Sequence, residues 1–172
     1  MTHRFSLAVR VLTAASVLCA LTLSATRTPS PLAHPAPQGK SVTTHAKGTF
    51  DVKLTPQDDK LDATLGRMTI DKQFHGDLEG SSKGQMLTVG TDVKGSGAYV
   101  AVERVTGKLN GRSGSFSMHH IGIMERGTPH LEISIVPDSG TGELTGISGK
   151  FGLTITDGKH SYDLEYTLPP TP

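Results

Sequence analysis

Apolar and polar residues alternate along most of the chain in short runs. Between residues 49 and 168 several runs have an apolar side chain at every second position, and glycine, proline, asparagine or aspartate bound the runs. Successive residues of a β-strand face opposite sides of a sheet, so this period of two predicts strands with one buried face. No run shows the periodicity of a long helix. The predicted strands cover residues 49–54, 65–78, 85–89, 98–105, 115–124, 131–135, 152–156 and 160–168.

Charged residues interrupt two of the apolar faces. Lys72 lies on the apolar face of the strand 65–78, where it can extend to the rim of the fold or contact an acidic ligand inside it. The strand 98–105 is apolar on both faces until Glu103 and Arg104, as expected for a strand that is covered on two sides. A buried carboxylate needs a partner. The candidates for pairing with Glu103 are Lys72, Arg104 and Arg112.

A repeated glycine motif predicts turns between the strands. The pattern G-x-L-x-G-x-S-G-x-F occurs at 107–116 and 142–151, and a looser copy occurs at 76–84. Glycine adopts positive φ and serine bonds to nearby backbone, so each copy is typical of a strand that enters a tight turn and leaves as the next strand. Asp157-Gly158 is a further hairpin signal. About eight strands and no helix predict an all-β fold, a closed antiparallel β-barrel that leaves no edge exposed.

The chain divides into three segments. Residues 1–25 have the features of a secretory signal peptide, with Arg4 and Arg10 ahead of an apolar stretch and Leu23-Ser24-Ala25 as a cleavage site. Residues 26–44 form a proline-rich linker that we expect to be disordered. Residues 45–170 form the barrel domain. The protein is therefore expected to be secreted or periplasmic.

The signal peptide also contains the only cysteine, Cys19. The mature protein is therefore expected to have no disulfide, no thiol nucleophile and no cysteine metal site. The apolar stretch is shorter than the roughly 20 residues that a membrane-spanning helix needs, so no stable membrane anchor is expected.

The composition excludes several kinds of partner. The formal net charge is +1, from 17 basic and 16 acidic residues, and a balance of this kind does not favour a nucleic-acid partner. The glycine-rich run 146–151 lacks the spacing of a phosphate-binding loop. No cofactor is predicted.

Several of these motifs carry a resemblance to known families. The run 139–149 resembles the glycine-rich stretch of dirigent proteins and allene oxide cyclases, and 74–78 resembles a segment of the cyclases. Residues 46–168 are similar to a bacterial family of unknown function that has an allene oxide cyclase-like barrel. The resemblance implies this dirigent-like fold and no particular activity. The family pattern is met by 76–80, 98–103, 111–116, His120 and 139–144.

A barrel of about eight strands is wide enough to hold one small ligand among its inner side chains. Apolar side chains on the predicted inner faces would form the walls of such a site, and Lys72, Glu103 and His120 would be polar anchors. The predicted ligand is a small apolar or amphipathic molecule. The predicted ligand-binding residues are Lys72, Phe74, Tyr99, Met118 and Tyr162.

Glu103 and His120 are the candidates for catalysis. As an alternative to simple binding, the protein would be an isomerase or cyclase in which either residue moves a proton or steadies a developing charge. The competing interpretation of His120 is a core histidine with a satisfied hydrogen bond. Whether the protein is an enzyme stays open at this point.

Histidine pairs in the sequence do not predict a metal site. His119 and His120 are neighbours on a strand and therefore point to opposite faces. His130 and Glu132 share a face, but the sequence supplies no third ligand. Exposed polar residues of a strand account for them, and no metal is predicted.

The functional hypotheses differ in what the barrel interior should contain. A cavity is expected for the binding protein, and a cavity with a shifted titration of Glu103 or His120 for the enzyme. A packed interior would indicate a third alternative, a structural barrel without a ligand. Copies of the chain are expected to form a homo-oligomer through the outer face of the barrel.

Overall fold

The structure, a computed structural model, describes residues 42–58 and 62–170, all within one compact unit, Gln38–Pro172. The predicted signal peptide, 1–25, and residues 26–41 of the predicted linker lie outside the described residues. The β-strands are β1 (Thr44–Pro56), β2 (Leu65–Gly76), β3 (Leu78–Gly90), β4 (Gly97–Leu109), β5 (Arg112–Glu125), β6 (Thr128–Ile135), β7 (Thr141–Gly142), β8 (Ser148–Thr156) and β9 (Lys159–Thr167).

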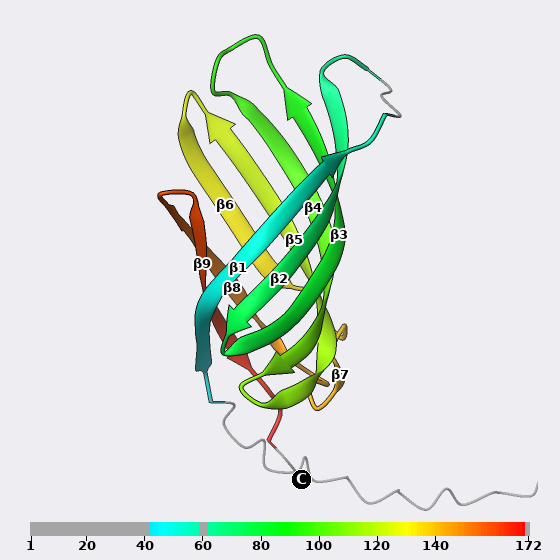
Figure 1. Ribbon diagram of the computed structural model, residues 1–172, viewed down its shortest axis with the longest axis vertical. Helices are drawn as coiled ribbons and strands as arrows, with labels where there is room; N and C mark the ends of the chain where they lie inside the picture. The colour runs from blue at the N-terminus through cyan, green and yellow to red at the C-terminus, as the bar shows by residue number, and fades with distance from the viewer. Residues whose placement is uncertain (1–41, 59–61, 171–172) are drawn as a thin grey trace, which may run out of the picture. The chain divides into compact units, whose positions relative to one another are not determined.

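The strands form one antiparallel sheet that closes on itself (Figure 1). The order around the ring is β4-β3-β2-β1-β9-β8-β6-β5, and pairing between β4 and β5 closes it. The short strand β7 pairs with β5 outside the ring. The first and last strands are neighbours, with Thr44 opposite Tyr166. The predicted closed antiparallel barrel of about eight strands is therefore confirmed.

Helices are absent from the part of the chain that the structure describes. These residues accordingly include no helix of the length and apolarity needed to cross a membrane.

The predicted strand 65–78 ends at Gly76, where a tight turn leads into the next strand. Gly76 has a φ of +104° and ends β2, and β3 begins at Leu78. A side chain at Gly76 would place its Cβ 2.7 Å from the carbonyl oxygen of Lys47, so glycine is required there. The expected turn within 76–84 therefore lies at the start of that segment, and the residues from Leu78 onward belong to β3. The alternation does not reveal this turn, because Phe74 before it and Leu78 after it both face inward and are spaced as in one continuous strand.

The turn occupies different positions in the copies of the motif. In 107–116 it lies at Asn110 and Gly111, whose φ angles are 48° and 81°. The predicted hairpin turn at Asp157 and Gly158 is confirmed, with φ angles of 51° and 75°. The motif therefore marks the presence of a turn but does not fix its position.

The outer face of β4 corrects a second expectation, because no layer formed by the described residues covers it. Val100 is 51% exposed and Val102 is 60% exposed. Val100 lies opposite Leu87 of β3 and Ile121 of β5, which are also exposed. The apolar run in β4 therefore reflects the strand preference of β-branched residues as well as burial. Association of copies through this face stays a prediction.

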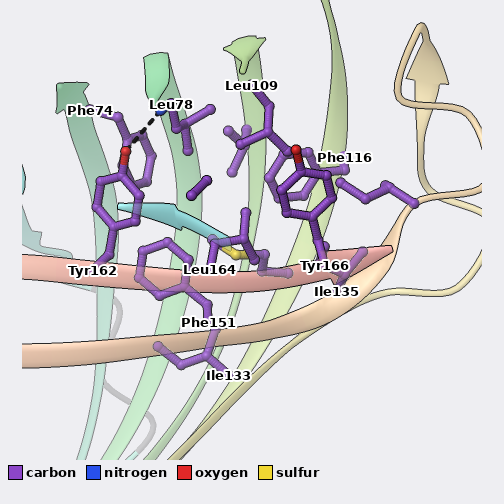
Figure 2. Close-up of a cluster of buried hydrophobic side chains, with 14 of the residues drawn as sticks. Phe74, Leu78, Leu109, Phe116, Ile133, Ile135, Phe151, Tyr162, Leu164 and Tyr166 are labelled. Carbon is purple, nitrogen blue, oxygen red and sulfur yellow. Dashed lines mark hydrogen bonds between the residues drawn. The ribbon is translucent and has the colours of Figure 1, made fainter. Parts of the chain in front are cut away.

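One half of the barrel is filled by packed side chains (Figure 2). Phe74 of β2 is central to the packing, with ring centroids 5.5 Å from Phe50 and 5.9 Å from Tyr162. The turns β2–β3 and β4–β5 lie at this packed end. The buried members of the cluster are Ala46, Phe50, Phe74, Leu78, Val105, Leu109, Phe116, Met118, Ile133, Ile135, Leu144, Ile147, Phe151, Tyr162, Leu164 and Tyr166.

The hydroxyl of Tyr162 ties β9 to the β2–β3 turn. It accepts a hydrogen bond from the backbone N–H of Leu78 at 2.9 Å, the dashed line in Figure 2, and donates to the carbonyl of His75 at 3.3 Å. The ring thus supplies apolar packing, and its polar atom satisfies a buried backbone donor.

Tyr162→Phe is expected to lower the free energy of unfolding by about 1–3 kcal/mol, because the N–H of Leu78 loses its acceptor in a buried position. Urea denaturation followed by circular dichroism measures this change. Tyr166→Phe is the matched control, since the Tyr166 hydroxyl bonds only the side chain of Asn110 among the described residues and should cost less. Equal stabilities of wild type and Tyr162→Phe would contradict the prediction.

Candidate functional site

The other half of the barrel contains a cavity of about 450 Å³. Its lining comes from the mouth end of the strands, including the end of β1, the end of β3, the start of β4 and the start of β9. Polar groups are few: Thr88, Tyr99, His130 and His160 lie in the walls, and Lys72 lies deeper. The apolar lining includes Val52, Leu54, Ile70, Met86, Leu131, Leu153 and Ile155.

A buried polar cluster separates this cavity from the packed half. It consists of Lys72 on β2, Ser82 on β3, Glu103 on β4 and His120 on β5, each from one of four adjacent strands. The strand register brings them together. Lys72 lies opposite Ser82, and His120 lies opposite Ala101, two residues before Glu103 on the same strand. All four are inward positions, because they share the pleat face of the core residues.

Glu103 is the centre of the cluster. Its Oε1 accepts a hydrogen bond from Lys72 Nζ at 2.7 Å, and its Oε2 accepts one from Ser82 Oγ at 2.6 Å. His120 Nε2 lies 2.9 Å from Oε1, within ion-pair distance. The two atoms are close, but their geometry is not that of a hydrogen bond. Nε2 is therefore a buried nitrogen without a hydrogen-bond partner among the described residues. The His120 contact is therefore a close approach, and the other two are hydrogen bonds.

Gly84 creates the space that Glu103 occupies. It lies directly opposite Glu103 in the β3–β4 register. A Cβ at Gly84 would lie 2.6 Å from the Cβ of Glu103 and 2.5 Å from the carbonyl oxygen of Val102. A glycine inside a strand often marks such a close approach. The carboxylate can therefore lie inward only because β3 has no side chain at this position.

Lys72 is the member of the cluster that meets the cavity. Its side chain is 8% exposed whereas that of Glu103 is 0% exposed, and Lys72 alone of the four lines the cavity. Its Nζ also lies 4.9 Å from the centroid of the Phe50 ring, which favours the cation. The floor of the cavity thus presents an ammonium group backed by a buried carboxylate.

The surroundings of Glu103 keep it ionised. Burial raises the pKa of this carboxyl, but the contacts with His120, Lys72 and Ser82 outweigh burial and lower it to about 2. Burial also raises the pKa of the Tyr99 hydroxyl, and the negative charge of Glu103 adds to that effect. Glu103 is therefore a weak base that serves as the counter-ion of Lys72.

Acid should destabilise the protein through this carboxylate. Its pKa in the fold, about 2, is below the ordinary value of 4.5, so the ionised form stabilises the fold above pH 4.5. This contribution is lost as pH falls from 4.5 towards 2, and it amounts to roughly 3 kcal/mol. Urea denaturation as a function of pH measures it. The variant Lys72→Met/Glu103→Gln should show a flatter profile, and equal profiles would contradict the assignment.

The structure separates the predicted ligand-binding residues into two groups. Lys72 and Tyr99 line the cavity. Phe74, Met118 and Tyr162 are buried in the packed half and do not line it. Period-two patterning shows which side chains face inward, but their height along the barrel axis depends on the register between strands. These three residues therefore pack in the core.

Sequence reasoning found Lys72, Glu103 and His120 but missed Ser82 and Gly84. The segment that contains both had been interpreted as a turn. The signal that was available is the alternation of Ser82, Gly84 and Met86, which all face inward from β3. Arg104, a predicted partner of Glu103, instead donates to Ser115 and Ser117.

The histidines do not gather around a metal site. His130 lies at the mouth among the lining residues, and Glu132 is exposed one pleat further along β6. The described residues include no group of three or more histidine, cysteine, aspartate or glutamate side chains that could hold a metal ion.

The fold and site define a class of protein: a closed antiparallel barrel that is packed at one end and has an apolar cavity, floored by a buried ion pair, at the other. The sequence profile of a family described as "Protein of unknown function (DUF3224)" matches residues 46–166. The chain belongs to the DUF3224 family.

A solved structure supports the same conclusion. The crystal structure of a protein of unknown function from the DUF3224 family of Shewanella oneidensis MR-1 is similar, with 46% sequence identity and a TM-score of 0.71. The similarity covers 76% of this chain and 100% of that chain. No curated protein matches the chain. The predicted membership of a family of unknown function with a barrel fold is confirmed, while the likeness to allene oxide cyclases stays a prediction.

Proposed function

We propose that the protein binds a small apolar or amphipathic molecule in the cavity at the mouth of the barrel. The observation that carries the proposal is the cavity itself, whose volume of about 450 Å³ lies within the range of about 300–1,000 Å³ usual for ligand sites. Its walls are mainly apolar, and a few polar groups converge on it, as is typical of such sites.

The site supports binding better than catalysis. The titration of Glu103 is shifted, as expected for the enzyme, but the shift lowers its pKa to about 2, whereas a general base works best when its pKa is near the operating pH. Both carboxylate oxygens accept hydrogen bonds from within the cluster, and neither Glu103 nor His120 lines the cavity. The two predicted catalytic residues of the isomerase or cyclase alternative are therefore not placed at the cavity wall. A filled structural barrel disagrees with the volume of the cavity.

The signal-like sequence at residues 1–25 supports a location outside the cytoplasm. We propose that the barrel binds its ligand in the periplasm or the surrounding medium. Mass determination of the mature protein from its host tests this location: a chain beginning near residue 26 supports it, and a chain that retains residues 1–25 contradicts it.

Native mass spectrometry of the protein purified from its host tests ligand binding. We expect a mass above that of the polypeptide, which returns to the polypeptide mass after denaturation, and an organic extract that contains the bound molecule. The protein should also bind N-phenyl-naphthylamine, an apolar dye whose fluorescence rises in apolar surroundings. A bare polypeptide that does not bind the dye would overturn the proposal.

A further inference from the structure

The floor of the cavity offers hydrogen-bond donors and no acceptor. An ammonium group has three N–H donors and no acceptor. Lys72 Nζ gives one of them to Glu103 Oε1, and the hydrogen bonds among the described residues assign it no other acceptor. Glu103, Ser82 and His120 carry the acceptor atoms of the cluster, and none of the three is part of the lining. The inner end of a ligand must therefore bring an acceptor of its own, or leave these donors unpaired in an apolar space.

The charge of the floor distinguishes between two kinds of acceptor. Lys72 is already neutralised by Glu103 at 2.7 Å. A carboxylate placed on Lys72 would add a second negative charge close to Glu103, in a cavity whose deep walls are Ile70, Met86 and Phe50. Burial of an excess charge in such surroundings is costly. A neutral carbonyl oxygen accepts the same hydrogen bond and adds no net charge.

We propose that the cavity takes a neutral carbonyl compound, an ester or a ketone, whose carbonyl oxygen accepts a hydrogen bond from Lys72 Nζ. The apolar part of the ligand lies along Val52, Leu153 and Ile155 and ends at the mouth. This inference rests on the proposed function, because it names the ligand class of the same cavity. It also gives Glu103 a role: this carboxylate balances the charge of Lys72, so the cavity favours a ligand with a hydrogen-bond acceptor but does not favour an anion.

Competition between three matched probes tests the ligand class. Methyl decanoate, decanoate and decane are each used to displace N-phenyl-naphthylamine from the full chain at about pH 8, where histidine side chains are normally neutral. We expect the ester to displace the dye at a concentration about tenfold lower than either decanoate or decane, which corresponds to one buried hydrogen bond to a charged donor.

Variants then assign the donor. In Lys72→Met/Glu103→Gln, which removes both charges together, the preference for the ester over decane should disappear. Lys53→Met, which changes an exposed lysine of β1, should keep it. Circular dichroism confirms that both variants are folded.

Each other outcome overturns a stated part of the inference. If decanoate binds as tightly as the ester, the ligand need not be neutral. If decane binds as tightly as the ester, the ligand does not need a hydrogen-bond acceptor. A preference for the ester that survives in the double variant removes Lys72 as the donor. If neither the dye nor any of the three probes binds, the proposed function fails, and the ligand class falls with it.

Discussion

Replacement of Glu103 by alanine is expected to lower the free energy of unfolding by about 3–5 kcal/mol, because it leaves the ammonium of Lys72 buried without its counter-ion. The variant also removes the acceptor of the Ser82 hydroxyl. A loss of this size is a large fraction of the stability of a typical domain, so partial unfolding at room temperature is part of the expectation. Chemical denaturation, monitored by circular dichroism, provides the measurement.

The double variant Lys72→Met/Glu103→Gln shows how much of the lost free energy of unfolding comes from leaving one charge unpaired and how much from losing the ion pair itself. With both charges removed together, most of the loss should be recovered, since a buried ion pair contributes little beyond a well-packed neutral replacement. The single variants Lys72→Met and Glu103→Gln form a thermodynamic cycle with this double variant. If the double variant is as unstable as Glu103→Ala, the pair itself stabilises the fold, and the role assigned to charge balance is contradicted.

Thr88→Trp is expected to weaken ligand binding by at least about tenfold, because the indole would occupy space in the mouth cavity that the ligand needs. Thr88 faces inward near the end of β3 and lines the cavity, and it is only half-buried, so the fold can accept a larger side chain there. Displacement of N-phenyl-naphthylamine and native mass spectrometry both measure the loss.

The neighbouring residue gives a matched control. Leu87 precedes Thr88 on the same strand but faces outward, where it is exposed. Leu87→Trp adds the same indole to the opposite side of the barrel wall and should leave binding unchanged. If Thr88→Trp binds as the wild type does, the ligand does not lie in the mouth cavity; if both variants lose binding equally, the effect is not one of occupied space.

The sequence predicted much of the interior because strand periodicity depends on local residues alone. The alternation placed Lys72, Phe74 and His120 inward, and their burial agrees with this prediction. The rule that a buried carboxylate needs a partner identified Lys72 as one candidate for Glu103, and the two are paired. A charge on an apolar strand face was therefore the most informative signal in the chain.

What the sequence did not predict depends on contacts between distant residues. The depth of Phe74 and of Tyr99 along the barrel follows from the stagger of strands around the ring, and no single strand carries that information. For the same reason Phe74 was expected in the ligand site and lies in the core. The outer valines of β4 were expected to be covered. Valine favours strands and is also common in cores, so the sequence alone does not separate these two reasons for its presence.

The pairing of β1 with β9 has a practical consequence for the way the protein can be attached to something else. Both ends of the barrel sequence, Thr44 and Thr167, lie at the packed end, while the cavity opens at the opposite end. A support or fusion partner joined after the last strand is therefore held away from the mouth. The same proximity suits a circular permutant in which a short linker joins the two ends and the chain is opened at Asp157-Gly158, so that the ring of strands persists with a different starting point.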